Sequence, residues 1–318
     1  MTSVAQGPYF DELTVGQEFA DAPSLTLTAG RAASHQAIVG DRLRLPLDDD
    51  LATRVSGAPL AHPALVCNVA IGQSTLATQH VKANLFYRNL VLLRQPAIGD
   101  SLRTVTTVVA MRENAQREGR RPTGLVALRM QTMDQHDRQV LDFFRCAMLP
   151  LAGPPGTGCA DDLDAIGSGA SSGVSDSVAH WDLAAVSNGS KPEAGESVSV
   201  FGGDVVSCAP ELARLTLNIA AVHHDETSSD TGRLVYGGHT IAIALSQVAR
   251  AFPDLLTVLS WTSCDHVGPV REGDTLRTQV EVLAVRRGVV GAEVDLRAFV
   301  AAQPARPVLD WRFTALFP

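Results

Sequence analysis

The sequence P-V-R-E-G-D-T-L-R-T at residues 269–278 has a counterpart earlier in the chain, P-A-I-G-D-S-L-R-T at residues 96–104. Asp100 corresponds to Asp274 and Leu102 to Leu276, so both pairs are 174 positions apart. In each copy a Gly-Asp turn signal leads into residues that are typical of a strand. The stretch therefore predicts the same turn and strand twice, which indicates a duplicated fold.

A second repeat supports this interpretation. V-L-D occurs at residues 140–142 and again at 308–310, which is 168 positions later, and a proline follows each copy at the same spacing. The spacing is six residues shorter than that of the first repeat. A longer, arginine-rich hairpin loop at residues 112–121 of the first copy accounts for the difference. We conclude that the chain consists of two homologous halves.

Each half is predicted to contain one central apolar helix and four strands that follow it. In the first half we expect helices at 29–39 and 64–77, a loop over 40–50, and strands at 24–28, 82–94, 101–111, 124–133 and 139–149. In the second half we expect a strand at 198–206, a helix-like run at 210–221, a helix that begins with two glycines at 237, and four more strands.

A sheet with one buried face that wraps around a helix satisfies both elements. Two such halves pair edge to edge into one extended sheet, which protects their edge strands. The predicted fold class is therefore α+β, a double hotdog made of two repeats. The predicted domains are an N-terminal hotdog at 1–151, a Gly/Ser-rich and mobile linker at 152–179, and a C-terminal hotdog at 180–318.

The composition excludes several classes of protein. The net charge of -8 provides no basic excess that would neutralise nucleic-acid phosphates. We expect neither a secretory signal nor a membrane-spanning segment. The five cysteines are scattered without a C-x-x-C pair, which favours reduced thiols in the cytoplasm and argues against a cysteine zinc site. The segment G-P-P-G-T-G at 153–158 lacks the lysine of a phosphate loop.

The stretch at residues 218–247 carries the candidate chemistry. It reads N-I-A-A-V-H-H-D-E-T, then a polar connection, then L-V-Y-G-G-H-T-I-A-I-A-L-S-Q. Histidines and carboxylates thus precede a helix that opens with two glycines. The free N–H groups at a helix start can hold an oxygen on which negative charge develops. This arrangement suits acid–base chemistry on a carbonyl compound.

Several stretches of the sequence resemble the MaoC-like dehydratases, which include the R-specific enoyl-CoA hydratases. F-D-E-L-T-V-G-Q-E-F at 10–19 is similar to the start of that family, and A-H-P-A-L-V at 61–66 and Y-G-G-H-T-I at 236–241 resemble its two central-helix starts. The finer pattern N-x-x-x-V-H, with S-H-Q-A-I-V-G-D-R-L-R-L and V-L-D-F-F-R in the first half, looks most like the mesaconyl-CoA hydratase (β-methylmalyl-CoA dehydratase) branch.

The acid–base motif of the family departs from its usual pattern here. It runs Asp, any residue, Asn, Pro, an apolar residue, then His. Counting back from His223, Asn218 stands at the Asp position and two alanines replace Asn-Pro. In the first half Asp41 stands at the place of Asn218, while Pro46 holds the histidine place. We therefore interpret the second half as catalytic and the first as the acyl and CoA channel. A site that combines Asp41 with His223 is the weaker alternative.

The resemblance implies residue roles in adding water to an unsaturated thioester. His223 is the candidate base and acid, because an imidazole titrates near pH ~6.5; alternatively it makes a structural hydrogen bond in a loop. His224 is the second choice. Asn218 orients water or the thioester, or it caps its helix. Asp225 is a candidate for the missing carboxylate, although acidic loop residues are commonly just solvated.

The backbone N–H of Gly238 is the candidate donor to the thioester oxygen; alternatively the two glycines only permit a tight turn. Arg233, Arg271 and Arg277 are candidates for the CoA phosphates, although such arginines are commonly just solvated. A zinc site made of His223, His224 and His239 lacks a fourth ligand, so we expect no metal.

The implied function is a hydro-lyase that acts reversibly on an enoyl-CoA, such as a short branched or dicarboxylic one like mesaconyl-CoA. We expect no cofactor beyond the CoA of the substrate, and a homodimer or larger homo-oligomer. Two alternatives stay open: a hotdog acyl-CoA thioesterase, and a non-catalytic acyl-CoA-binding subunit.

Overall fold

The structure is a computed structural model that describes residues 5–169, 176–186, 189, 192–229 and 232–318. In the first half the helices are α1 (Ala29–Val39), α2 (Arg44–Leu47), α3 (Asp49–Ser56) and α4 (Pro63–Gln73). Its strands are β1 (Glu18–Phe19), β2 (Leu25–Thr26), β3 (Ala83–Leu92), β4 (Ser101–Glu113), β5 (Thr123–Met133) and β6 (Gln139–Pro150). Both helices and all five strands that the sequence predicts for this half are present, β2 as two residues only.

The second half repeats this order. Its helices are α5 (Ala209–Leu215) and α6 (Gly237–Ala251), and its strands are β7 (Ser197–Ser199), β8 (Asp204–Val205), β9 (Thr257–His266), β10 (Thr275–Arg287), β11 (Ala292–Ala302) and β12 (Arg306–Phe317). Short 3-10 turns include η2 (Ser74–Thr78), η5 (Ala221–His223) and η6 (Glu226–Ser228).

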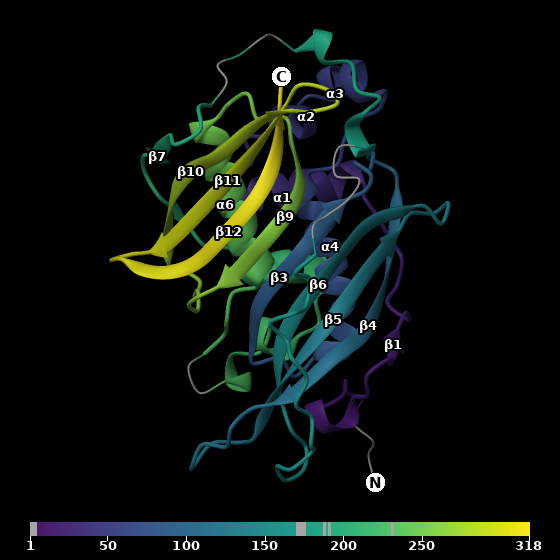
Figure 1. Ribbon diagram of the computed structural model, residues 1–318, viewed down its shortest axis with the longest axis vertical. Coiled ribbons are helices and arrows are strands. Elements are labelled where there is room, and N and C mark those ends of the chain that lie inside the picture. The colour runs from purple at the N-terminus through teal and green to yellow at the C-terminus, as the bar shows by residue number, and fades with distance from the viewer. Residues whose placement is uncertain (1–4, 170–175, 187–188, 190–191, 230–231) are drawn as a thin grey trace.

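The two halves join into one antiparallel sheet. Among the described residues the strand order is β1-β4-β5-β6-β3-β9-β12-β11-β10-β7, with β2 beside β4 and β8 beside β10. Strand β3 of the first half pairs with β9 of the second, for example Tyr87 opposite Cys264. Figure 1 shows these two strands side by side, with the blue and teal strands beyond one and the yellow strands beyond the other. The predicted edge-to-edge pairing is confirmed.

The same hydrogen bond recurs at the repeat spacing in both halves. The side-chain amide of Gln73, at the end of α4, donates to the carbonyl oxygen of Leu102 at 2.9 Å. Gln247 of α6 donates to the carbonyl oxygen of Leu276, also at 2.9 Å. Each residue lies 174 positions from its counterpart, so the two central helices dock on their sheets in the same way.

Helices α4 and α6 form the centre of the core and pack against each other. Every residue of α4 is buried, because its sequence P-A-L-V-C-N-V-A-I-G-Q is apolar on nearly all sides. Helix α6 is buried from Gly238 to Ala249. The sheet curves around both helices, so their first turns lie inside the molecule.

The expectation of a loop over residues 40–50 is wrong, because that segment begins α2 and α3. Asp48 caps α3 by accepting a hydrogen bond from the backbone N–H of Leu51 at 2.9 Å. Leu51, Ala52 and Val55 are buried on one face of this helix. The acidic run 48–50 is therefore a helix start, where carboxylates are favoured by the unpaired N–H groups, and not a solvated loop.

The helix-like run predicted for 210–221 also ends early. Helix α5 stops at Leu215, and Leu217 has a positive φ of 61° that ends the helical backbone. The chain then turns at Asn218 and enters η5. This early stop places Asn218 in the turn between α5 and η5, while His223, which the predicted run did not include, lies at the end of η5.

The linker is packed where the structure describes it. Ala160 forms an isolated β-bridge with Arg112 of β4, and Leu163 is buried against residues of the first-half sheet that include Ala127 and Cys146. These described residues of the predicted linker therefore contact the first-half sheet, while their mobility stays a prediction. Residues 170–175 lie outside the described part of the chain.

Candidate active site

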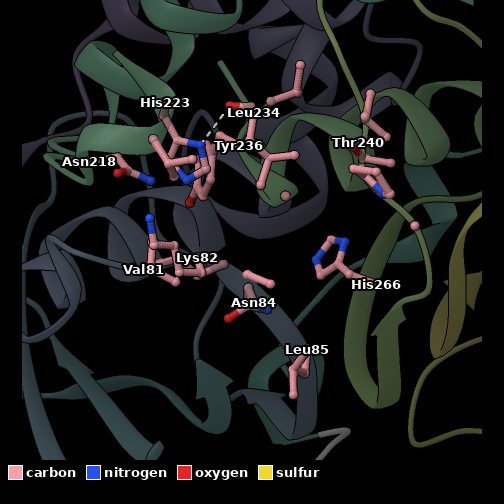
Figure 2. Close-up of a pocket in the computed structure, with 18 of the residues that line it drawn as sticks. Val81, Lys82, Asn84, Leu85, Asn218, His223, Leu234, Tyr236, Thr240 and His266 are labelled. Atoms are coloured by element: carbon pink, nitrogen blue, oxygen red, sulfur yellow. Dashed lines mark hydrogen bonds between the residues drawn. The ribbon is translucent and has the colours of Figure 1, made fainter. Parts of the chain in front are cut away.

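A cavity of about 420 Å³ lies at the joint between the two halves. The first half contributes residues from η2–β3 and β6, including Lys82, Asn84, Tyr87 and Arg145. The second half contributes Asn218, His223, Tyr236, Gly237, Thr240, His266 and Arg271. Figure 2 shows labelled side chains from both halves around one open space. The first half, predicted to provide the acyl and CoA channel, contributes one wall of this cavity, and the second half contributes the other.

His223 lies at the end of η5 and is 8 % exposed. Its Nδ1 is 2.9 Å from the carbonyl oxygen of Leu234, a contact that Figure 2 draws as a dashed line. A carbonyl oxygen can only accept, so Nδ1 carries the proton and Nε2 keeps its lone pair. Burial lowers the pKa of His223 to about 4. The ring is therefore neutral near pH 7 and able to accept a proton.

Asn218 stands beside His223 and is held by two contacts. Its Oδ1 accepts a hydrogen bond from the N–H of Ala220 at 3.0 Å, and its carbonyl oxygen accepts one from Nε2 of His224 at 2.6 Å. The side-chain nitrogen is left as a donor on the cavity side, and Figure 2 shows it directed toward His223. His224 thus positions Asn218, while Asn218 can orient a water or a thioester oxygen.

The first turn of α6 borders the cavity through Gly237. The N-cap residue Tyr236 makes no side-chain hydrogen bond to the helix, which leaves N–H groups of the first turn for a ligand. Gly238 is buried behind Gly237, and an added Cβ there would lie 2.1 Å from Oδ1 of Asn68. Of the two glycines at this helix start, Gly237 lines the cavity and the predicted Gly238 does not.

The sequence reasoning missed His266. It ends β9, and Figure 2 shows it across the cavity from His223. Its Nε2 has no hydrogen-bond partner among the described residues, and its ring meets that of Tyr87 edge-on at 5.8 Å. Burial lowers the pKa of His266 to about 4. The available signal was its position in D-H-V-G-P, immediately before the turn that opens the repeated stretch.

The sequence reasoning also missed Arg145, an arginine of β6 that lines the cavity and is 3 % exposed. At the repeat spacing of 168, Phe313 occupies the corresponding place in the second half. The strand partners correspond as well. Tyr87 of β3 pairs with Arg145, and its counterpart Trp261 of β9 pairs with Phe313. Comparing V-L-D-F-F-R with V-L-D-W-R-F shows the arginine shifted into an inward-facing place.

Asp41 and Asn218, which are predicted to be equivalent, make the same local turn. Oδ1 of Asp41 accepts from the N–H of Leu43 at 2.9 Å, as Asn218 does from Ala220. Asp41 nevertheless contacts a histidine, because Nε2 of His62 lies 2.9 Å from its Oδ1. Pro46 does hold the histidine place of the motif, but His62, the N-cap residue of α4, supplies a histidine to Asp41 from another segment. Neither residue lines the cavity.

The other predicted residues fall mostly outside the cavity. Asp225 is exposed and caps η6 through the N–H of Thr227. Arg233 pairs with Glu272 at 2.8 Å, and Arg277 donates to the carbonyl oxygen of Gly202. Of the three arginines predicted for CoA phosphates, Arg271 alone lines the cavity.

His223, His224 and His239 do not assemble as ligands. Within the described ranges, no three His, Cys, Asp or Glu side chains are grouped so that they could hold a metal ion. No helix in this part of the chain has the length and apolar character needed to span a bilayer.

Comparison with known sequences finds two informative relatives, while no protein-family model matches the chain. It is 28 % identical to the β-methylmalyl-CoA dehydratase of Chloroflexus aurantiacus, over 96 % of this chain and 91 % of that one. It is 25 % identical to the mesaconyl-CoA hydratase of Cereibacter sphaeroides, over 87 % and 83 %.

Comparison with solved structures confirms the predicted fold. Rv0216 of Mycobacterium tuberculosis, described as a double hotdog, is 53 % identical with a TM-score of 0.92 over 98 % of each chain. A MaoC domain dehydratase from Chloroflexus aurantiacus has a TM-score of 0.87 at 24 % identity, over 100 % of this chain and 99 % of that one, which shows the shared fold.

Proposed function

This chain belongs to the same double-hotdog family as Rv0216, and we propose that it is a hydratase that adds water reversibly to the double bond of an α,β-unsaturated acyl-CoA. The resemblance to the MaoC-like dehydratases and their mesaconyl-CoA hydratase branch, inferred from sequence, agrees with the names of the two relatives. One observation carries the proposal: a neutral, buried imidazole presents an unprotonated Nε2 in a cavity beside a helix start.

In the proposed reaction, Nε2 of His223 accepts a proton from water while the water oxygen bonds to Cβ of the substrate. The electron pair of the double bond moves toward the thioester, whose oxygen gains negative charge. N–H groups at the start of α6 stabilise that oxygen. The imidazolium of His223 then donates the proton to Cα, so the product has gained one water and the enzyme is restored. Dehydration follows the same steps in reverse.

The neighbouring groups support this assignment. Asn218 offers a side-chain N–H for the attacking water or the thioester oxygen. Lys82 is exposed and Arg271 is half-buried, and both line the cavity. We propose that these two cations receive the CoA phosphates, that the protein works in the cytoplasm as a homo-oligomer, and that it needs no cofactor other than the CoA of its substrate.

The test follows the absorbance of the conjugated enoyl thioester when purified protein is added to crotonyl-CoA or mesaconyl-CoA, together with a free-thiol assay. We expect the absorbance to fall without release of thiol. His223→Ala is expected to lower the rate by about 10²–10⁴. His180→Ala, at an exposed histidine outside the cavity lining, is the matched control. Release of thiol would indicate a thioesterase, and binding without turnover would indicate an acyl-CoA-binding subunit.

A further inference from the structure

Arg145 is a buried cation without a buried anion. Its Nε donates to Oδ1 of Asn84 at 2.8 Å, and its two Nη atoms donate to Oγ of Ser74 at 2.6 Å and Oγ1 of Thr78 at 2.9 Å. All three partners are neutral. Within the described part of the chain, no carboxylate lies at ion-pair distance from this guanidinium. Burying a charge without a counter-ion costs folding free energy, because the charge loses its hydration. A bound anionic ligand would offset this cost.

The fold itself does not require a cation here. Phe313 fills the corresponding place in the second half, where it stacks on Trp311 at 3.9 Å. Arg129 and Arg297 are another pair of residues at the repeat spacing of 168. Both form ion pairs, Arg129 with Asp142 and Arg297 with Asp310, each at 2.6 Å. Arg145 therefore differs from them both in its burial and in its lack of an acidic partner.

The guanidinium keeps unused donors for a ligand. An arginine has five N–H donors in a planar fork, of which the three contacts use three. Arg145 lines the same cavity as His223. Figure 2 shows Asn84, the acceptor of its Nε, across the cavity from His223. Because each Nη uses one N–H on a neutral hydroxyl, one donor remains on each Nη atom, and two such donors are the number that a bidentate carboxylate contact needs.

On the basis of the proposed hydratase function, we propose that Arg145 binds a free carboxylate on the acyl group, so that the preferred substrate is an enoyl-CoA whose acyl chain ends in a carboxylate. The CoA phosphates are a less suitable partner, because they are bulky, highly charged and matched by the exposed cation Lys82. The carboxylate would complete the ion pair that the protein lacks, and it would hold Cβ at a fixed place relative to His223.

The first experiment uses unmodified protein and two substrates that differ in one group. Mesaconyl-CoA with its methyl group on Cα and tigloyl-CoA have the same double-bond geometry, but tigloyl-CoA has a methyl group where mesaconyl-CoA has the carboxylate. We expect kcat/KM for mesaconyl-CoA to be higher by about 10- to 100-fold, the range of a charged hydrogen bond. Equal values, or a preference for tigloyl-CoA, would overturn the proposal.

The second experiment changes the arginine. Arg145→Met is expected to lower the ratio of the two kcat/KM values by about 10- to 100-fold, and Arg145→Lys to keep part of the preference, because it retains the charge and loses the fork. An equal loss for both substrates would mean that Arg145 acts on the thioester or only on folding, and it would refute the assignment. If Arg145→Met does not fold, as judged by its circular dichroism, Arg145→Lys and the unmodified protein decide.

A binding measurement separates this proposal from the proposed function. Methylsuccinyl-CoA and 2-methylbutanoyl-CoA are the saturated counterparts of the two substrates and cannot be hydrated. We expect calorimetry to give at least tenfold tighter binding of methylsuccinyl-CoA, and this preference to disappear in Arg145→Met. If no enoyl-CoA is turned over, the hydratase proposal fails, yet this comparison still supports or refutes recognition of a carboxylate.

Discussion

Nδ1 of His223 lies 2.9 Å from the carbonyl oxygen of Leu234, and this single contact selects Nε2 as the basic nitrogen. The carbonyl belongs to the backbone, so no side-chain substitution at Leu234 removes it directly. Burial of the ring keeps its neutral form dominant near pH 7. These two properties make the behaviour of His223 testable by titration of the reaction itself.

The pH dependence of hydration should therefore have an unusually low acid limb. A neutral His223 is required, and its pKa is lowered to about 4, so kcat/KM should stay level from pH 8 to about pH 5 and fall on further acidification. Brief assays over pH 4–8, with circular dichroism recorded at each pH, would measure it. An acid limb near pH ~6.5, the ordinary value for histidine, would contradict the assigned environment.

Asn218→Asp should move that acid limb upward. Aspartate can keep the turn by accepting from the N–H of Ala220, as Asp41 does from Leu43. Its negative charge beside His223 favours the imidazolium, which raises the pKa of His223 by about 1–3 units. The pH profile of the variant measures this shift. Asn218→Ala, which removes the turn contact and adds no charge, is the control, and an identical limb in both variants would exclude the expected interaction.

Gly237→Ala should impair activity through His266. An added Cβ at Gly237 would lie 2.6 Å from Nε2 of His266, so the ring must move into or away from the cavity. We expect kcat/KM to fall at least about tenfold, as overpacking forces side chains from their rotamers. Gly30→Ala, in the first turn of α1, meets no atom closer than 3.9 Å and should gain up to about 1 kcal/mol in stability. Full activity in Gly237→Ala would show that the position of His266 is unimportant.

Acidification should destabilise the fold between pH 6.5 and about 4. Burial lowers the pKa values of His223, His239 and His266 to about 4, while the unfolded chain binds protons near pH ~6.5. The folded state therefore holds fewer protons in this window, and the free energy of unfolding decreases as the pH falls. Urea unfolding at pH 8, 6 and 5 would measure the decrease.

His239→Leu should weaken this dependence. His239 is 0 % exposed, and neither ring nitrogen has a hydrogen-bond partner among the described residues. Leucine removes both polar atoms and the titration, so the variant should be stabilised relative to the parent, and more at pH 5 than at pH 8. A stability difference that does not change with pH would mean that His239 is not protonated on unfolding in this range.

The sequence was sufficient for the fold, because the repeat spacings of 174 and 168 place the same strands and helices twice. It also located Asn218 and His223, since a family motif can be counted along a loop. It could not locate Arg145 and His266. These two residues reach the cavity only because β3 and β9 pair across the joint, and that pairing brings together residues more than 100 positions apart.

The sequence also failed to predict the end of α5 at Leu215 and the two helices within residues 44–56, for a different reason. Leu217 adopts a positive φ that an apolar run gives no sign of, and the cap supplied by Asp48 looks like a solvated acidic loop in the sequence. The packed linker residues could not be foreseen either, because Leu163 is buried by a surface that exists only in the folded sheet. Local composition does not report such contacts.

The pairing of β3 with β9 has a consequence for how the chain can be divided. Tyr87 and Asn84 on one strand and His266 on the other border the same cavity, and His223, the proposed base, stands in the segment between α5 and α6. A chain cut between its two repeats would yield two fragments, each with part of the cavity wall and neither with the whole cavity. We therefore expect the joined pair to be the smallest unit with the proposed activity, and we expect reassembly of the severed fragments to restore that activity.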